Sequence, residues 1–582
     1  MADEAVRDAR RTTAVLNLLR PAGMVRRPGR LRGARADLTA AAFGALAALA
    51  FPPVFALPVL LVAFPVLIAL LDAAPRPAVA ARRGWWFGFG LHLVGLYWIT
   101  EAILVEAAKF WWLVPFAVPA LAAVLAAFIA AAAFVARYAH RGWPRVLALA
   151  GAWTLADLAR QFVATGFPWN PIGSVWEFPG PLGNVFIQPA SLVSVHGLTL
   201  ATVLLACLPM LGWRWRSAGA ALFAAWLGFG LVRMHAPLPP APGVKVVLVQ
   251  GDVAEGQKWD RRLMMDIFTR YLRLTRQGVM QAGSGPAVVV WPETASPFLL
   301  QRDAVARQDI SAAAENHPAL VGAVRFGRDN RPRNSLFALT GNGDIAGVYD
   351  KWHLVPFGEY QPSWLPLGIQ IVPGGGFAAG PGPRTLLVPG LPPAGALICY
   401  EAIFPGQVVD SADRPAWMVN VTNDAWFGNS TGPRQHLAAA RMRAVEEGLP
   451  LLRAANTGIS AVFDPRGQEL ARIGMNRAGV LVADLPPALP PTFFARFGLA
   501  IPMTLATLST MVGLLALRLL RRKQRHAGQE AKIRHYILLY VVFAGPALSL
   551  TILGCAVKRF LTRQSESVAK RAMGASGARH AG

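Results

Sequence analysis

Three short blocks in the more polar half of the chain join an apolar run to side chains that act as acids, bases or nucleophiles. The first block, Val-Val-Val-Trp-Pro-Glu, ends at Glu293. The second occupies residues 349–360 and contains Lys351, and the third, Leu-Ile-Cys-Tyr-Glu, contains Cys399. A carboxylate, an ammonium group and a thiol can together perform covalent acyl transfer, so these blocks are the candidate catalytic centre.

The chemistry of such a centre follows from its thiol. A thiolate is a good nucleophile and a fair leaving group, so Cys399 can take an acyl group from an ester and release it to an amine. A thiol with an unperturbed pKa of ~8.5 is mostly protonated at neutral pH. Glu293 is therefore expected to act as general base during the attack and as acid toward the departing alcohol. Lys351 and the backbone N–H after Cys399 are expected to stabilise the oxyanion, and the charge of Lys351 to favour the thiolate.

Other interpretations of these residues remain open. A cysteine that closes a buried strand often only packs, Glu293 could be a solvated loop carboxylate or a helix cap, and Lys351 could be a surface charge. A Cys-His pair would indicate papain-like hydrolysis, and sequence distance does not exclude His353 or His436 as its base. However, His353 lies within the lysine block and His436 begins a predicted helix. No Cys or His pair here has the spacing of metal ligands, so no metal site is predicted.

The composition indicates a membrane protein. Of the 582 residues, 54% are hydrophobic, more than soluble globular chains usually contain. The net charge of +25 does not indicate nucleic-acid binding, because the Lys and Arg residues cluster beside apolar runs instead of forming one stripe. Of the three cysteines, Cys207 and Cys555 lie in long apolar segments, so a disulfide framework is not expected.

Apolar segments predict a membrane bundle on both sides of a soluble domain. A basic cytoplasmic tail, residues 1–37, precedes a seven-helix membrane region, residues 38–233. The apolar segments are 38–51, 54–71, 84–105, 110–135, 146–163, 192–211 and 218–232. Arg residues concentrate in alternate loops, which places the N-terminus inside and the chain after the seventh segment outside. A returning helix is predicted at 499–517, and the basic region 518–582 contains a further apolar segment, 536–556, that its flanking charges do not orient.

Residues 244–485 have the composition of a soluble α/β domain, entered through a Pro-rich linker. Short β-branched runs predict buried strands, and longer mixed segments predict helices. The predicted strands are 244–249, 287–291, 320–324, 397–399 and 418–421, and the predicted helices are 261–281, 304–316 and 435–447. Because functional residues of α/β sheets commonly lie at strand ends, the reactive side chains are expected there.

The three blocks, in this order, resemble the nitrilase superfamily, whose Glu, Lys and Cys triad lies on a four-layer αββα fold. Together with the apolar segments, they make the chain similar to bacterial apolipoprotein N-acyltransferases from about residue 38 to residue 525. Three ordered blocks inside a matching topology are more specific than any single motif. The resemblance implies a membrane α-helical bundle plus an α/β nitrilase-like αββα sandwich domain.

The resemblance also implies an activity and a location. It implies transfer of a fatty acyl chain from a phospholipid to the N-terminal α-amino group of a diacylated apolipoprotein, through a thioester at Cys399 and without a cofactor. The protein would be a multi-pass protein of the bacterial inner membrane with its catalytic domain in the periplasm. Supporting roles are implied for Glu359, Tyr400 and Glu401, and substrate contacts for Trp259, Asn423 and Trp426. Structural hydrogen bonds, packing and helix capping are the competing roles for these residues.

Two other functions remain in competition with acyl transfer. The same three residues could serve a membrane-tethered amidase or nitrile hydrolase, in which water is the acceptor. A membrane scaffold that has the fold but no catalytic activity is a further alternative. A covalent acyl adduct mapped to Cys399 would separate the transferase from the scaffold, and the final product would separate it from the hydrolase.

Overall fold

The structure, a computed structural model, describes residues 28–105, 107–258, 260–363 and 376–525, with side chains as far as Ala516. The predictions for residues 1–27, for Trp259 and for the apolar segment 536–556 lie outside the described residues. The chain divides into two compact units, Met1–Leu515 and Ala516–Gly582. The first unit contains both the helical region and the α/β domain.

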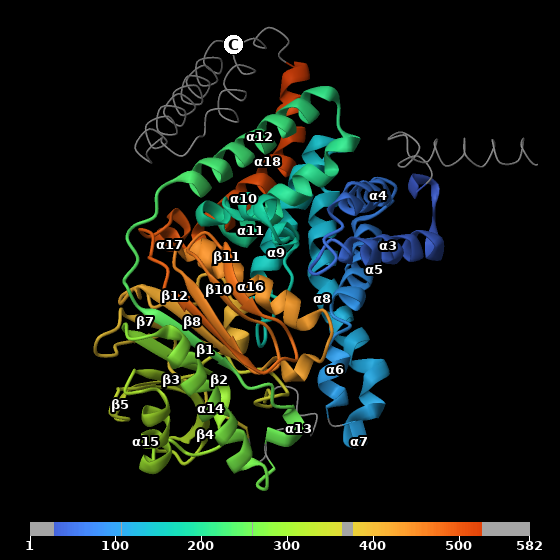
Figure 1. The fold of residues 1–582 in the computed structure, drawn as a ribbon. Coiled ribbons are helices and arrows are strands. Elements are labelled where there is room, and N and C mark those ends of the chain that lie inside the picture. The colour runs from blue at the N-terminus through green and yellow to red at the C-terminus, as the bar shows by residue number, and fades with distance from the viewer. Residues whose placement is uncertain (1–27, 106, 259, 364–375, 526–582) are drawn as a thin grey trace, which may run out of the picture. The chain divides into compact units, whose positions relative to one another are not determined.

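A helix overlaps each of the seven apolar segments predicted in the first part of the chain (Figure 1). These helices are α3 (Gly33–Ala48), α4 (Leu60–Asp72), α5 (Pro77–Gly95), α8 (Val114–Arg137), α9 (Trp143–Ala159), α11 (Ala190–Cys207) and α12 (Trp213–His235). Shorter elements connect them: α6 (Ile99–Leu104), α7 (Ala107–Phe110), α10 (Pro181–Ile187), and the 3₁₀ turns η1 (Pro28–Arg30), η2 (Leu57–Val59), η3 (Trp111–Leu113), η4 (Ile172–Trp176) and η5 (Leu208–Met210). Helix α3 begins at Gly33, inside the predicted basic tail.

Length and composition distinguish these helices. Among the described residues, three helical segments are long and apolar enough to cross a membrane: Ala107–Arg137, Ala190–Met210 and Trp213–His235. Two further apolar helices, Leu57–Asp72 and Ala500–Ala516, are shorter. The seven crossings and their orientation stay predictions.

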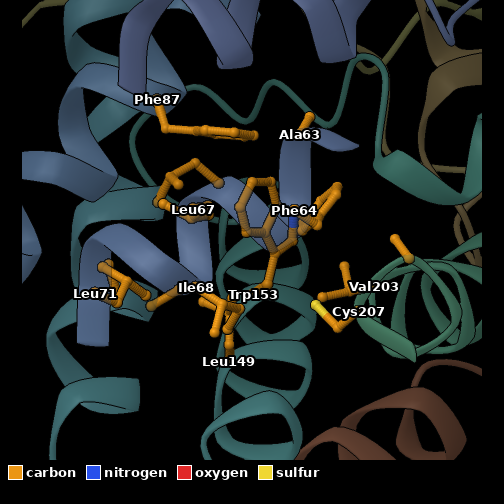
Figure 2. Packing of buried hydrophobic residues seen from close by; sticks show 14 of the residues in the cluster. Ala63, Phe64, Leu67, Ile68, Leu71, Phe87, Leu149, Trp153, Val203 and Cys207 are labelled. Carbon is orange, nitrogen blue, oxygen red and sulfur yellow. The ribbon is translucent and has the colours of Figure 1, made fainter. Parts of the chain in front are cut away.

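Large apolar side chains fill the centre of the helical region. Trp153 of α9 packs against Phe64 of α4, with ring centroids 5.2 Å apart, and against Phe87 of α5, with ring centroids 6.0 Å apart. Figure 2 shows these rings together with Cys207, whose thiol lies among apolar side chains. Cys207 is therefore a packing residue.

Two six-stranded sheets form the α/β domain. The first has the order β12-β1-β2-β3-β4-β5 and the second β11-β10-β9-β8-β7-β6. The strands of the first sheet are β1 (Lys245–Gln250), β2 (Ala287–Ser296), β3 (Ala319–Phe326), β4 (Pro332–Leu339), β5 (Ile345–Asp350) and β12 (Gly479–Asp484). Those of the second are β6 (Thr385–Leu386), β7 (Ala394–Ile398), β8 (Trp417–Thr422), β9 (Leu451–Ala455), β10 (Ser460–Phe463) and β11 (Glu469–Ile473). In each sheet three neighbouring strands run parallel, β1-β2-β3 in the first and β7-β8-β9 in the second. The remaining strands pair antiparallel with their neighbours.

Helices cover the outer faces of both sheets (Figure 1). The helices α14 (Met264–Ala282) and α15 (Ala304–Ala313) share an apolar cluster with the first sheet, and α16 (Gly432–Glu447) shares one with the second. A separate cluster, contributed by alternate residues of the inner strands, lies between the two sheets. The remaining elements are α13 (Glu255–Lys258), η6 (Cys399–Ile403), η7 (Asp424–Phe427), α17 (Phe493–Phe497) and α18 (Ala500–Arg525). The predicted αββα sandwich beside a helical bundle is confirmed.

Every predicted strand and helix of the domain is present, although several bounds differ. Strand β2 continues to Ser296, so Glu293 lies inside a strand and the expectation that it ends one is wrong. Helix α16 begins at Gly432, which places His436 past its first turn. The strands β4, β5, β6 and β9 to β12 were not predicted, because they are short or carry polar residues that interrupt an apolar run.

Candidate active site

Glu293 lies where β2 loses its regular pairing. The register between β2 and β3 shifts between Trp291 and Ser296, and Thr294 has a left-handed φ of 46°. Pro292 has no N–H to donate to the ladder, which fits this break. Irregularities of this kind change the direction of a side chain, so that it no longer follows the alternation between the two faces of the sheet. The Trp-Pro-Glu sequence therefore places a carboxylate at a break in an otherwise buried strand.

The Glu293 carboxylate is buried and held on both oxygens. Its Oε1 lies 3.1 Å from Lys351 Nζ and accepts a hydrogen bond of 2.7 Å from Asn334 Nδ2. Its Oε2 accepts the backbone N–H of Asn423 at 2.8 Å. Lys351, only 1% exposed, also pairs with Glu359 Oε2 at 2.9 Å, and Asn334 Nδ2 bridges to Glu359 Oε1 at 2.9 Å. One ammonium group thus lies between two carboxylates in the protein interior.

Cys399 lies at the turn where β7 passes into η6. Its φ is 51°, a left-handed conformation that is uncommon for a residue with a side chain. Such strain persists only where the surroundings hold it, and it is frequent at reactive sites. Cys399 is 6% exposed, and Thr422 ends β8, the strand that runs parallel to β7. The parallel pair β7 and β8 therefore brings the ends of both strands to the candidate nucleophile.

The two residues after Cys399 fix its turn. The Glu401 carboxylate is fully buried and accepts from the Ile398 N–H at 2.6 Å, from the Trp352 N–H at 2.7 Å and from the Tyr349 hydroxyl at 2.8 Å. Glu401 thereby ties the lysine block to the cysteine block. Tyr400 donates its hydroxyl to the Gly166 carbonyl at 2.8 Å, in a loop of the helical region. In the structure both residues have positioning roles.

The pKa directions describe a site that rests as a charged pair beside a neutral thiol. Burial raises the pKa of Glu293, but the charges of Lys351 and Lys258 outweigh it, so the net pKa is lowered. Burial lowers the pKa of Lys351, but Glu293 and Glu359 outweigh it and raise the pKa well above its usual value. Burial and the charge of Glu293 raise the pKa of Cys399, against the opposing effect of Lys351. Lys351 thus favours the thiolate, as expected, but burial and Glu293 outweigh its effect and the thiol stays protonated.

The predicted substrate residues fall into different environments. Asn423 is buried, and besides its N–H bond to Glu293 its side chain contacts Glu255 and accepts from Asn456 Nδ2 at 3.0 Å. Its amide is thus part of the site's framework. Trp426 is half-buried on η7. The structure therefore assigns Asn423 a positioning role, and the substrate contact expected of Trp426 stays a prediction.

Neither histidine is arranged as a base for the thiol. His353 Nε2 lies 2.7 Å from Gln407 Oε1, its ring stacks on Phe404, and burial lowers its pKa to about 4. His436 Nε2 lies 2.9 Å from the backbone carbonyl of Cys399. A carbonyl oxygen only accepts, so this nitrogen carries a proton and has no lone pair to offer.

The fold brings together three side chains that metal-ligand spacing in the sequence did not indicate. Atoms of Cys399, Asp424 and His436 lie within 4.8 Å of one another. However, Arg453 Nη2 lies 2.7 Å from Asp424 Oδ2 and 3.0 Å from His436 Nδ1. A guanidinium already provides the positive charge beside these groups, so the donor set does not fit a metal ion.

Two polar residues of the site were missed by the sequence analysis. Asn334 lies in β4, a strand without a recognisable pattern, and no sequence signal marks it. Lys258 precedes Trp259, yet its buried ammonium donates to the Glu293 carbonyl at 3.1 Å and contacts the Thr294 hydroxyl. It clamps the irregular part of β2 from the α13 side. Its sequence neighbours are mostly polar, so no local pattern marks it.

Comparison with known proteins identifies both parts of the chain. Residues 43–208 match the apolipoprotein N-acyltransferase N-terminal domain, and residues 248–489 match the carbon-nitrogen hydrolase family. An apolipoprotein N-acyltransferase of Bradyrhizobium diazoefficiens is 41% identical over 521 residues, covering 84% of this chain and 95% of that protein. One of Rhodopseudomonas palustris is 40% identical over 507 residues, covering 82% and 94%. Because these relatives share both the helical region and the site-bearing domain, this chain belongs to the apolipoprotein N-acyltransferase family.

Proposed function

We propose that this membrane enzyme transfers a fatty acyl chain to the N-terminal amine of apolipoproteins and carries that chain as a thioester on Cys399. Lipoprotein N-acylation is the activity for which its relatives are named. The observation that carries the mechanism is the gathering of Glu293, Lys351 and Cys399 in one buried site, where their charges shift one another's pKa.

The first half-reaction would form the thioester. Cys399 Sγ attacks the carbonyl carbon of a phospholipid ester while Glu293 takes the thiol proton. A neutral resting thiol beside an ionised carboxylate is the state that this transfer requires. Lys351 and the Tyr400 N–H stabilise the oxyanion, and Tyr400 is suited because it lies in the first turn of η6, where N–H groups lack intrahelical partners. The C–O bond then breaks, and Glu293 returns the proton to the departing lysophospholipid oxygen.

The second half-reaction would pass the acyl chain to the apolipoprotein. The neutral α-amine attacks the thioester carbon and Glu293 takes a proton from the nitrogen. The C–S bond then breaks, and Glu293 passes this proton to Sγ, which restores the Cys399 thiol and the ionised Glu293. With a pKa near ~8, an α-amine supplies a useful neutral fraction at neutral pH, unlike a lysine side chain. The chemistry therefore favours an N-terminal acceptor.

Both substrates would be lipids or lipid-bearing chains held in the membrane. Alternating basic loops favour an inner-membrane protein whose catalytic domain faces the periplasm. The phospholipid donor and the diacylated acceptor would both reach the thiol from the outer leaflet. No cofactor enters either half-reaction.

The test compares wild-type protein with Cys399→Ser and with Cys207→Ala as a matched control. Full-length protein is incubated with phospholipid and a diacylated lipopeptide, and the products are identified by mass spectrometry. We expect wild type and Cys207→Ala to add one acyl chain to the lipopeptide and Cys399→Ser to be at least ~10³-fold slower. Free fatty acid as the sole product would support the tethered hydrolase, no product from the wild-type protein would support the scaffold, and full activity in Cys399→Ser would contradict the thioester on Cys399.

A further inference from the structure

The peptide unit that links Cys399 to Tyr400 is held by a histidine from another element. His436 of α16 is fully buried, and its Nε2 donates to the Cys399 carbonyl at 2.9 Å. In a planar trans peptide the C=O and N–H groups point in opposite directions. Holding the Cys399 oxygen on one side therefore fixes the Tyr400 N–H on the other, where the proposed mechanism needs an oxyanion donor. The hydrogen bond also polarises the peptide, which strengthens that N–H as a donor.

The far side of the His436 ring is held in either protonation state. Nδ1 lies 2.9 Å from Asp424 Oδ1 and 3.0 Å from Arg453 Nη2. When Nδ1 carries a proton it donates to the carboxylate, and when it does not it accepts from the guanidinium. Burial and the charge of Arg453 lower the pKa of His436 against the effect of Asp424, so the ring is neutral with its proton on Nε2. The orientation of the ring therefore does not depend on pH.

The turn of α16 that carries His436 is anchored from the helical region. Gln435 Oε1 accepts from Trp169 Nε1 at 2.9 Å, and Gln435 Nε2 donates to the carbonyls of Pro52 and Gly95 at 3.2 and 3.3 Å. Gln435 is 4% exposed, so these hydrogen bonds are shielded from solvent. Gln435 thus binds the helical bundle, and the next residue, His436, binds the backbone of Cys399.

From these contacts we propose that His436 is a positioning residue that holds the Cys399–Tyr400 peptide so that the Tyr400 N–H faces the oxyanion formed at Cys399. The proposal rests on the proposed acyl transfer. His436 touches no reacting atom and takes no proton. It acts on the left-handed backbone at Cys399, whose conformation needs such support.

The test uses two substitutions of nearly equal shape. In His436→Gln the amide nitrogen reaches about as far as Nε2 and still donates to the Cys399 carbonyl, whereas His436→Met fills the same space without a donor. Full-length protein in phospholipid nanodiscs is mixed with excess donor lipid, and acylation of Cys399 is followed by intact-protein mass spectrometry. We expect His436→Gln to acylate within ~5-fold of wild type and His436→Met to be ~10- to 100-fold slower, as for a lost buried hydrogen bond.

Further readouts separate positioning from a general structural effect. The loss in His436→Met should appear in the rate at saturating donor and not in the KM for donor, and its pH profile should keep the wild-type shape. Rates are taken per folded protein, measured by size exclusion. If the Met variant does not fold, His436→Asn takes its place, because its amide reaches only the Nδ1 position.

Equal acylation rates in the donor-bearing and donor-free variants would overturn the positioning role, whether both rates are high or low. A changed pH profile would also overturn it, since a proton-transferring histidine would then be required. A wild-type protein that forms no thioester would count against the proposed function instead.

Discussion

Asp424 and Arg453 form an ion pair beside the nucleophile that is completely removed from solvent. Their closest atoms are 2.7 Å apart, and both side chains are 0% exposed. Removing one partner of such a pair leaves an uncompensated buried charge, which typically costs about 3–5 kcal/mol. Burial raises the pKa of Asp424, but the charge of Arg453 outweighs this effect and lowers the pKa, so the pair contributes fully at pH 7 and is lost only as the pH falls through that lowered pKa.

Arg453→Met is therefore expected to lower stability strongly at pH 7. The control is Arg472→Met, because Arg472 pairs with Glu469 at 3.6 Å and is 58% exposed, and an exposed pair contributes only about 0–1 kcal/mol. Thermal unfolding of both purified variants in the same detergent measures the effect. An Arg453→Met protein that unfolds at the same temperature as Arg472→Met would contradict the importance of the buried pair.

At the level of single residues, the sequence indicated the candidate reactive residues but not the side chains that position them. Glu293, Lys351 and Cys399 stood out because each follows or interrupts an apolar run. Asn334 and His436 reach the site from elements distant in the sequence, and their partners are backbone atoms or other polar side chains. A contact of that kind leaves no local pattern, so His436 could be weighed only as a base or a helix residue.

Helices α3 and α5 approach each other through glycines. A Cβ atom built on Gly90 would lie 2.0 Å from the Ala41 carbonyl oxygen, and one on Gly44 would lie 1.9 Å from the Phe87 carbonyl oxygen. Small residues at helix crossings allow backbones to approach closely, and packing of this kind stabilises helices in a membrane. The glycines are therefore packing surfaces and not points of flexibility.

Gly90→Ala is expected to destabilise the bundle, because the added methyl group meets backbone that a rotamer change does not move. Gly228→Ala in α12 is the matched control, since nothing lies within 4 Å of its Cβ position. Alanine in a helix interior is otherwise favourable by roughly 0.5–1 kcal/mol over glycine. Thermal unfolding should place Gly90→Ala below wild type and Gly228→Ala at or above it. The reverse order would contradict the close packing of α3 on α5.

Several of the strands that were missed lie in a different environment from those that were predicted. Strands β1, β2, β3, β7 and β8 are parallel and buried on both faces, so they read as continuous β-branched runs. Strand β4 contains Arg333, Asn334 and Ser335 within its eight residues, and β11 is largely exposed. Their pairing is set by neighbouring strands and hairpin turns, which a single apolar pattern does not reveal.

The two half-reactions of the whole enzyme should respond differently to pH. Between pH 7 and 9 Glu293 stays ionised, Lys351 stays charged and Cys399 stays protonated, because their pKa values are shifted away from this range. Thioester formation should therefore change by no more than about twofold, the change expected from Glu401, whose pKa burial raises to about 7. Aminolysis should rise about tenfold, following the neutral fraction of an α-amine with a pKa of ~8.

Each step is measured separately in the full-length protein. Thioester formation is followed with donor lipid alone, and aminolysis by adding lipopeptide to protein that is already acylated. The range begins at pH 7 because the pKa of Glu401 is raised by burial to about 7, and its protonation below that pH would loosen the turn around Cys399. A tenfold rise in thioester formation itself would mean that the thiol must ionise beforehand, against a role for Glu293 as its base.

The hydrogen bonds of Tyr400 and Gln435 to the helical region have a consequence for the origin of reactivity in this enzyme. A fragment cut free at residue 244 would keep both sheets and all three reactive side chains. It would nevertheless lose the Gly166 carbonyl that orients the neighbour of the thiol, and the acceptors that anchor the turn before His436. We therefore expect the thiol to become fully reactive only when the α/β domain has docked on the helical bundle that precedes it in the chain.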